Sequence, residues 1–328
     1  MTAAQEMIGR QLALRAVVWD IWDMHGVDAK RLEEEMQLFK VRRIQTADDR
    51  NENARARYQK LCSCLHNAGI AQKDALLVTE DAGLAGYVYD LRYGKPLIAG
   101  EDACEEETVQ QEALPGMGVV FFEREGSRAE VSADMVVLGF EEAGVQFMDR
   151  VLKRRNRLPW NILYTRRTCV REITLGDLDE LYRLYEGDGM TDYTDPLLER
   201  ALEEAYTRSY IDYMYYYYGY GMWVVLDKET GKLIGRAGIE HRETQDGVLM
   251  ELGYVIGTAY QKQGYATEVC QAIAAYAAEE LGIEQLHCFI HPHNNGSLRV
   301  AQKLGFTLCA EPDAKQKELL HFCKNMGS

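Results

Sequence analysis

QKQGYATE, at residues 261–268, is the stretch that decides the fold of the second half of the chain. It follows an apolar, strand-like run at 248–257 and opens a helical pattern that extends to about residue 281. Gly264 allows the backbone to approach a ligand closely, and Ala266 keeps the next turn small. Backbone N–H groups at such a helix start converge on an anion, and the helix N-terminus adds partial positive charge. The stretch therefore predicts an anion-binding loop.

Alternating strand and helix patterns extend on both sides of this loop, and a turn at 228–231 joins two of the strands. We expect strands at 169–173, 222–227, 233–242, 248–257 and 286–291, and helices at 177–185, 197–218, 265–281 and 297–304. The chain is long enough for two domains. The expected domains are an accessory domain at 1–160 and an α/β domain at 161–328.

A known family shares the pattern Gln-x-x-Gly-x-Ala between a strand and a helix. MELGYVIG (250–257) lies upstream of the pattern, HPHNNGSLRVAQKLGF (291–306) downstream, and WVVLDKETGKLIGRAGI at 223–239. Together these segments resemble the GNAT superfamily of N-acetyltransferases, over residues 166–323, and within it the branch of the ribosomal-protein alanine acetyltransferases. The resemblance implies a mixed, strongly bent sheet with helices on both faces. Its fourth and fifth strands splay apart, so that the pantetheine arm of acetyl-CoA pairs with an exposed strand edge.

The resemblance also implies which residues bind acetyl-CoA. The pantetheine-pairing strand corresponds to Tyr254, Val255 and Ile256. The pyrophosphate loop corresponds to Gln261, Lys262, Gln263, Gly264, Tyr265, Ala266 and Thr267. Asn294 matches the asparagine that follows the fifth strand, where its amide can orient the cofactor. An asparagine at a helix start also satisfies backbone donors as an N-cap, and both roles stay open.

The implied mechanism is direct attack of a neutral amine on the thioester, which requires a base to take the proton of the ammonium. Glu251 is the first candidate, because it precedes the pantetheine-pairing segment and partial burial would raise its pKa. Alternatively, this carboxylate could point away from the cleft or be fixed by an arginine such as Arg236. Glu240 is the second candidate base, and His241 is a weaker one.

The proton donor for the leaving thiolate is less evident in the sequence. Many relatives place a tyrosine seven residues after the asparagine that corresponds to Asn294, but this chain has Ala301 there. Ser297, which begins the last helix of the family pattern, is the substitute donor that we expect. Otherwise the thiolate leaves unassisted.

A run of tyrosines between residues 210 and 220 has the most unusual composition in the chain. In the superfamily, the region before the first hairpin lines the acceptor cleft. On an α-helix, Tyr210, Tyr213, Tyr217 and Tyr220 would share one face. Phenol rings can hold an amine by cation–π contact and hydrogen bonds, or they can pack the two halves of the chain together. The candidate acceptor-binding residues are Tyr213, Tyr217, Tyr220 and Glu240.

The first half of the chain changes pattern near residue 70. Before it, apolar runs such as 13–22 and 31–40 predict helices, with a further helix that ends near Gly69. After it, short apolar runs predict strands at 75–79, 96–99, 118–123 and 135–138, with helices at 83–93 and 145–155. This alternation predicts a small, mainly parallel sheet.

Residues 70–160 loosely resemble the back half of haloacid-dehalogenase-like phosphatase domains. Those enzymes need two aspartates separated by one residue, because a nucleophile and its partner acid must face one phosphoryl group. VVWDIWDMHG instead has Asp20 and Asp23 three residues apart. We therefore expect a degenerate accessory domain in the first half.

Composition and charge exclude several classes of protein. The formal net charge is -15, from 37 basic and 52 acidic residues, which argues against a nucleic-acid partner and mildly favours a cationic acceptor. The chain has no stretch of 18 apolar residues and no signal-peptide pattern, so no membrane partner is expected.

The eight cysteines indicate neither a metal site nor a redox motif. Cys62 and Cys64 have a single-residue spacing that matches neither a zinc knuckle nor a CxxC pair. Most of the others lie in apolar runs, where a reduced cysteine acts as a small hydrophobic residue. The simplest interpretation is a reduced cytoplasmic protein that uses no metal.

Three functions remain open at this stage. The first is an acetyl-CoA-dependent N-acetyltransferase acting on a primary amine, either a small molecule or a protein N-terminus. The second is a non-catalytic acyl-CoA-binding sensor or scaffold, which Ala301 keeps open. The third is a bifunctional protein whose first half retains phosphoryl chemistry. The sequence does not name the acceptor or the oligomeric state.

Overall fold

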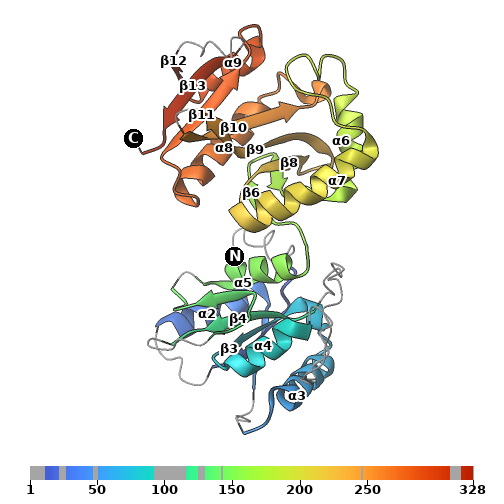
Figure 1. Ribbon diagram of the computed structural model, residues 1–328, viewed down its shortest axis with the longest axis vertical. Coiled ribbons are helices and arrows are strands. Elements are labelled where there is room, and N and C mark those ends of the chain that lie inside the picture. The colour runs from blue at the N-terminus through green and yellow to red at the C-terminus, as the bar shows by residue number, and fades with distance from the viewer. Residues whose placement is uncertain are drawn as a thin grey trace, which may run out of the picture. The chain divides into compact units, whose positions relative to one another are not determined.

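The computed structural model describes residues 12–21, 27–46, 51–91, 116–124, 130–141, 143–244, 247–310 and 319–327. The chain divides into two compact units, Met1–Leu158 and Pro159–Ser328. Both units combine helices with a β-sheet (Figure 1).

The sheet of the first unit is parallel in every strand pair that the structure describes, as the sequence predicts. Its strand order is β2-β1-β3-β4-β5. The strands are β1 (Ala16–Asp20), β2 (Arg42–Gln45), β3 (Ala75–Thr79), β4 (Gly118–Phe122) and β5 (Met135–Val137). The register places Asp20 at the end of β1 beside Thr79 at the end of β3.

Helices cover both faces of this sheet. They are α2 (Val27–Phe39), α3 (Ala54–Asn67), the short η1 (Gln72–Asp74), α4 (Ala82–Asp90) and α5 (Val145–Arg155). Val17 and Trp19 point to the face covered by α2 and α5. Ala16 and Val18 point to the face covered by α3 and α4. Side chains of a strand alternate between faces, so each of the two cores takes every second residue of β1.

The prediction of a helix at 13–22 is wrong, because residues 16–20 form the buried strand β1. All five residues of β1 are buried, since a central parallel strand has helices on both of its faces. Such a strand is a continuous apolar run without alternation, and periodicity cannot distinguish it from a buried helix segment. The expected strand at 96–99 lies outside the described residues.

The sheet of the second unit has eight strands in the order β12-β13-β11-β10-β9-β8-β7-β6. The strands are β6 (Asn161–Tyr164), β7 (Thr168–Arg171), β8 (Met222–Asp227), β9 (Leu233–Thr244), β10 (Gly247–Ile256), β11 (Gln285–Ile290), β12 (Thr307–Ala310) and β13 (Leu320–Asn325). Strands β10 and β11 pair in parallel, while the other described pairs are antiparallel. The mixed sheet confirms the predicted fold class, although β6, β12 and β13 were not predicted.

The helical segments of the second unit are η3 (Leu175–Asp177), α6 (Leu178–Tyr185), α7 (Arg200–Tyr210), η4 (Ile211–Tyr218), η5 (Thr258–Tyr260), α8 (Tyr265–Glu279) and α9 (Asn295–Lys303). Helix α8 covers the face that carries Trp223, whose ring meets Tyr276 edge-on with 5.8 Å between centroids. Helix α7 reaches the opposite face, where Tyr210 bonds Glu240. Helices on both faces also agree with the sequence analysis.

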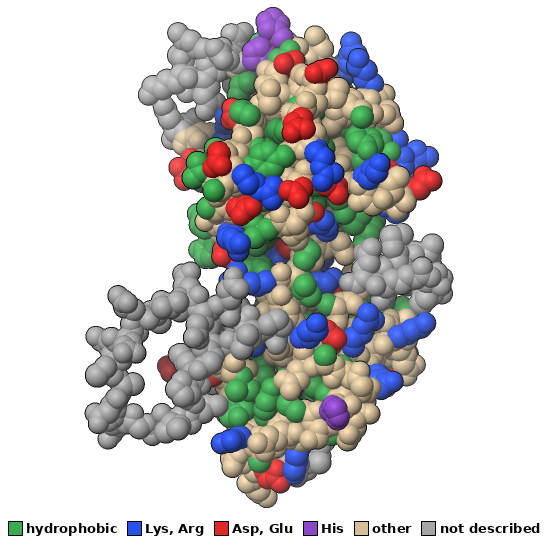
Figure 2. Space-filling view, turned by 90° about the vertical axis from the view of Figure 1, so that its right-hand side faces the viewer, with side chains coloured by type: hydrophobic (Ala, Val, Ile, Leu, Met, Phe, Trp, Pro, Cys, Tyr) green, Lys and Arg blue, Asp and Glu red, His purple; other side chains and the backbone are tan. Residues whose placement is uncertain are grey.

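Two of the cysteines form a disulfide, Cys309–Cys323, so the expectation of reduced cysteines is wrong for this pair. The two residues lie on neighbouring strands, and the 13 residues between them hid that proximity in the sequence. No helix among the described residues is long and apolar enough to cross a membrane. On the face of the second unit in view in Figure 2, acidic and basic side chains are interspersed.

Candidate active site

The loop at 261–264 turns sharply before α8 begins at Tyr265. Lys262 has a φ of 60° and Gly264 a φ of 86°, so two of its residues are left-handed. Alternation of left-handed and ordinary conformations forms a concave nest of N–H groups. The first N–H groups of a helix have no partner within the helix, so those of α8 add to the nest. The geometry is suited to an anion.

Arg167 directly precedes β7 and supports the loop. Sequence analysis did not identify this residue. Its guanidinium Nε lies 2.8 Å from Glu268 Oε2, and its Nη1 donates to the Gln263 carbonyl at 3.1 Å. The guanidinium also stacks 4.0 Å from the centroid of the Tyr265 ring. Burial opposes the charge of Glu268, but hydrogen bonds from Thr165 and Arg167 outweigh it and lower the pKa of this carboxyl. Arg167 therefore joins both sides of the turn.

Strands β10 and β11 separate next to the loop. Among the described residues, the two parallel strands pair at one position, Glu251 with His287. Residues 254–256 continue to pair with β9 on the other side of β10. Their edge toward β11 is therefore left open, as the family resemblance implies for the pantetheine arm.

A cavity of about 700 Å³ lies where the open strand edge meets the loop. Segments that are distant in the sequence line it together. All but one of the expected cofactor residues belong to its lining: Tyr254, Val255, Ile256, Gln261, Lys262, Gly264, Tyr265, Ala266, Thr267 and Asn294. Gln263 is the exception, and its side-chain amide donates to the Ala259 carbonyl at 2.9 Å.

The cavity wall also contains charged residues outside the expected cofactor set. Arg299 and Lys303 come from α9 and add positive charge to that of Lys262. Asp188 and Asp192 come from the loop that follows α6. Basic and acidic groups thus line the same cavity, and only the fold reveals that these segments meet.

Ser297 and Tyr254 line the cavity together. Asn294 Oδ1 accepts the Ser297 N–H at 3.0 Å, so the N-cap role of Asn294 is present in the structure. The Tyr254 hydroxyl is buried and makes no hydrogen bond within the described part of the chain. Burial raises the pKa of Tyr254, and Ser297 lies beside it but outside hydrogen-bonding geometry. Ala301 is 3% exposed and packs in the core.

Glu251 lies on β10, outside the residues that line the cavity. Arg242 Nη1 donates to its Oε2 at 2.6 Å, so the partner is Arg242 rather than Arg236. Burial raises the pKa of Glu251, and the bond from Arg242 only partly offsets this. A partly buried carboxyl whose pKa lies above its usual range has the chemistry of a general base.

Glu240 faces Glu251 across the β9–β10 pair. Its Oε1 accepts a hydrogen bond from the Tyr210 hydroxyl at 2.7 Å. The same hydroxyl accepts the Met222 N–H at 2.6 Å. Burial and the charge of Glu240 together raise the pKa of Tyr210 well above its ordinary value. Tyr210 therefore stays neutral and holds Glu240 in place.

The tyrosine run does not share one α-helical face, because residues 211–218 wind as the π-helix η4. Tyr210 is buried, whereas Tyr213 and Tyr217 are 54% and 77% exposed. The rings of these two stack with an interplanar angle of 4°, and the Tyr220 hydroxyl lies 3.9 Å from the sulfur of Met250. None of the three expected acceptor tyrosines lines the cavity. A π-helix has a wider turn than an α-helix, so the expected spacing does not apply.

Residues 167–307 match the family model described as "Acetyltransferase (GNAT) domain". This segment resembles that family, and we call it the GNAT domain below.

Curated relatives match part of the chain. The uncharacterized protein YkkB of Bacillus subtilis is 34% identical over 88 residues, which are 27% of this chain and 51% of that protein. The uncharacterized N-acetyltransferase YoaA of Bacillus subtilis is 27% identical over 146 residues, 44% of this chain and 82% of that protein. The chain thus spans about half of the length of YkkB and most of that of YoaA. An acetyltransferase structure from Agrobacterium tumefaciens is 24% identical, with a TM-score of 0.43, and the match covers 50% of this chain and 93% of that one.

Outside the GNAT domain, the aspartate considered for phosphoryl chemistry is fully engaged. Asp20 is 1% exposed and accepts two bonds from Arg57 Nη2, at 2.8 and 2.7 Å. The hydroxyls of Thr46 and Thr79 donate to it at 2.8 and 2.6 Å. Four hydrogen bonds fill the acceptor positions of a carboxylate. Asp23 lies outside the described residues.

Proposed function

We propose that the GNAT domain transfers the acetyl group of acetyl-CoA to a primary amine. The observation that carries the proposal is the cavity at the open edge of β10, where the anion-binding loop and Asn294 meet. Such a cavity has a polar end for a pyrophosphate and a free strand edge for an amide-containing arm. Acetyl-CoA combines these two chemical features.

Positive charge at the loop end supports the placement of the phosphates. Lys262, Arg299 and Lys303 line the cavity together with the start of α8. A helix N-terminus and cationic side chains both stabilise phosphate oxygens. The N–H and C=O groups of residues 254–256 that point away from β9 would then bond the amides of the pantetheine arm, as a strand pairs with a neighbour. The Ile256 carbonyl already accepts the Gln261 side-chain amide at 2.9 Å, so this bond would have to give way or be shared.

Glu251 is the proposed base, acting through water because it does not line the cavity. The amine nitrogen attacks the thioester carbonyl carbon, and its proton passes to the carboxylate. As the carbon–sulfur bond breaks, the thiolate takes a proton from a hydroxyl at the other end of the cavity. Ser297 is the candidate from the family pattern, and the unpaired hydroxyl of Tyr254 is the second.

The acceptor is proposed to be a cationic amine in solution, either a small molecule or a protein N-terminus. Asp188 and Asp192 in the cavity wall supply negative charge that would attract it. The exposed rings of Tyr213 and Tyr217 and the carboxylate of Glu240 are proposed to contact more distant parts of an acceptor. The full hydrogen bonding of Asp20 argues against phosphoryl chemistry in the first unit, so we propose that it is an accessory domain.

An assay of turnover distinguishes an acetyltransferase from a non-catalytic acyl-CoA sensor. The full chain is incubated with acetyl-CoA and a panel of primary amines and N-terminal peptides, and free thiol release is followed. An enzyme releases thiol with at least one acceptor class. Calorimetric binding of acetyl-CoA without thiol release over the whole panel would support the sensor instead.

Glu251→Gln tests the assignment of the base. We expect kcat to fall by about 10²–10⁴-fold, the usual contribution of a general base. The affinity for acetyl-CoA should change little, because Glu251 does not line the cavity. Glu243→Gln, an exposed acid on β9, is the matched control and should keep the wild-type rate. An unchanged rate in Glu251→Gln would show that another group takes the proton.

A further inference from the structure

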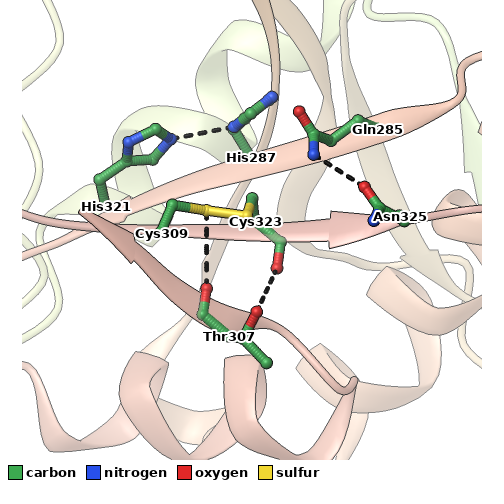
Figure 3. The surroundings of a disulfide bond; sticks show 7 residues. All are labelled: Gln285, His287, Thr307, Cys309, His321, Cys323 and Asn325. Atoms are coloured by element: carbon green, nitrogen blue, oxygen red, sulfur yellow. Dashed lines mark hydrogen bonds between the residues drawn. A yellow bond between two sulfur atoms is a disulfide. The ribbon is translucent and has the colours of Figure 1, made fainter.

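Two histidines and two cysteines meet on the last three strands of the second unit (Figure 3). They are His287 on β11, Cys309 on β12, and His321 and Cys323 on β13, here called the strand-edge cluster. No motif in the sequence groups them, because 35 residues lie between the first and the last and the spacing is irregular.

Strand register explains why the four side chains converge. His287 lies directly opposite Cys323 in the antiparallel β11–β13 pair, so both side chains point to the same face. His321 is two residues from Cys323 and shares that face. Cys309 is the extra residue of a register shift between β12 and β13. Such a bulge redirects a side chain, and here it brings Cys309 to Cys323.

Three of the four donor atoms are already close to the distances in a metal site, and the fourth, Cys323 Sγ, is bonded to Cys309 until the disulfide is reduced. His287 Nδ1 and His321 Nε2 are 2.9 Å apart. A ligand atom from each of the two imidazoles and Cys309 Sγ all lie within 4.8 Å of one another. Tetrahedral zinc, with bonds of about 2.0–2.1 Å to nitrogen, needs roughly 3.3 Å between two nitrogen ligands. The histidines would therefore move by only a few tenths of an ångström.

We propose that the strand-edge cluster, when its disulfide is reduced, binds one Zn²⁺ ion in a tetrahedral Cys₂His₂ site. Soft thiolates with imidazoles select zinc over the hard cations that prefer oxygen. Two thiolates and two neutral imidazoles around Zn²⁺ have no net charge. The disulfide form is also neutral, so either state can occupy a half-buried position without an unpaired charge.

Conversion of the disulfide form into the zinc-bound form balances in atoms and electrons when a dithiol is the reductant. The dithiol gives two electrons to the Cys309–Cys323 bond, becomes a cyclic disulfide, and leaves two protein thiols. Binding of Zn²⁺ then releases the two thiol protons as the sulfurs become ligands. Cys309 is exposed, so both the reductant and the metal can reach the cluster from solvent.

Neighbouring side chains hold the cluster in place. The ring of Phe289 stacks on that of His321, with 4.5 Å between centroids, and Arg242 lies 4.1 Å over the Phe289 ring. Arg242 is also the partner of Glu251. A bound metal would fix β12 and β13 to β11, within a continuous path of contacts that reaches the proposed base.

Cobalt substitution tests the site on the full chain. Protein reduced with a phosphine under anaerobic conditions is titrated with Co²⁺ and then with Zn²⁺. We expect one Co²⁺ per chain, with tetrahedral visible bands and thiolate-to-cobalt charge transfer, both lost when Zn²⁺ displaces it. Oxidised protein should bind none. A reduced chain that gives no such spectrum would overturn the proposal.

Variants locate the metal. Cys309→Ser is the main variant because Cys309 is exposed and its change should not disturb folding, which far-UV circular dichroism checks. His321→Ala removes an imidazole. Each should lose the bound equivalent of Co²⁺. The double variant Cys62→Ser/Cys64→Ser removes two thiols elsewhere and should retain it. Retention in Cys309→Ser, or loss in the double variant, would place the metal elsewhere and refute the site.

Discussion

Individual residues build the anion-binding loop by adopting backbone conformations that few residues tolerate. Lys262 and Gly264 both have positive φ, and Arg167 fixes the turn through the Gln263 carbonyl and the ring of Tyr265. A Cβ on Gly264 would lie 3.6 Å from Arg167 Nη2, which is ordinary van der Waals contact. The requirement for glycine therefore comes from the backbone conformation rather than from contact with protein atoms.

Gly264→Ala is expected to weaken acetyl-CoA binding. A non-glycine residue at a φ of 86° carries roughly 1–2 kcal/mol of strain, which the loop can relieve by opening the nest. Gly231→Ala is the matched control, because Gly231 has a φ of 72° and open space around its Cβ position. Both variants should lose similar stability in urea unfolding, but only Gly264→Ala should lose affinity in calorimetry. Equal affinities in the two variants would contradict the role of the loop.

Sequence analysis identified the loop residues because they form one continuous stretch of the sequence, whose residue types and order can be recognised directly. It did not identify the partners that long-range register creates. Arg236 and Arg242 have the same strand parity, so alternation alone cannot tell which of them reaches Glu251. The β9–β10 register places Arg236 opposite Val255, four residues from Glu251, whereas Arg242 lies two residues past its direct partner Glu240. Arg167 is 97 residues before Gly264, and no sequence pattern connects them.

At the scale of helices and strands, two properties limited prediction from the sequence. They are the burial of a strand on both of its faces and the local winding of a helix. Strand β3 was predicted with its observed bounds, because polar residues flank a short run of four apolar residues and Thr79. Strand β1 has the same buried pattern but lies among apolar residues that extend beyond it, so a helix was predicted. The π-helix η4 was predicted as α-helix, since a tyrosine run contains no signal for the wider turn.

The start of α6 depends on one carboxylate. Asp177 accepts hydrogen bonds from both terminal nitrogens of Arg171, at 2.8 and 2.6 Å, and from the N–H and hydroxyl of Thr174. Burial opposes the charge of Asp177, but the bonds from Arg171 and Thr174 outweigh it and lower the pKa of this carboxyl. Thr174 and Asp177 thus form the capping box of η3, the turn that leads into α6, and Arg171 ties this turn to β7.

Asp177→Asn is expected to lower the free energy of unfolding by about 1.5–3 kcal/mol at pH 7, the usual contribution of hydrogen bonds to a charged group. Because the folded pKa is depressed, this stabilisation is present above the unfolded value of about 3.9 and is lost as pH falls through the folded pKa. Urea unfolding at pH 7 and pH 3 should therefore show a smaller difference from wild type at pH 3. Asp179→Asn, in an exposed pair with Arg200, should unfold like the wild type at both pH values. A difference for Asp177→Asn that does not change with pH would contradict the charge-based explanation.

At the scale of the whole molecule, the candidate site and a buried charge network lie in different units. The lining of the candidate site comes entirely from the second unit. The first unit contains a buried charge network at the carboxyl ends of β1 and β3, in which Arg57 pairs with Asp20 and Asp81. Burial opposes the charge of Arg57, but the two carboxylates raise its pKa. Saturated hydrogen bonding makes this network a structural element of the first unit.

Arg57→Met is expected to destabilise the first unit without weakening acetyl-CoA binding. Loss of one partner leaves the buried charge of Asp20 without its counterion, which costs about 3–5 kcal/mol. Arg43→Met is the control, because the pair of Arg43 with Glu33 is exposed and contributes about 1 kcal/mol or less. Hydrogen exchange should accelerate in β1 and β3 of Arg57→Met and stay unchanged in β8, β9 and β10, while calorimetry gives the wild-type affinity for acetyl-CoA. Equal acceleration in both sheets would mean that the two units unfold as one, and that the accessory unit stabilises the GNAT domain directly.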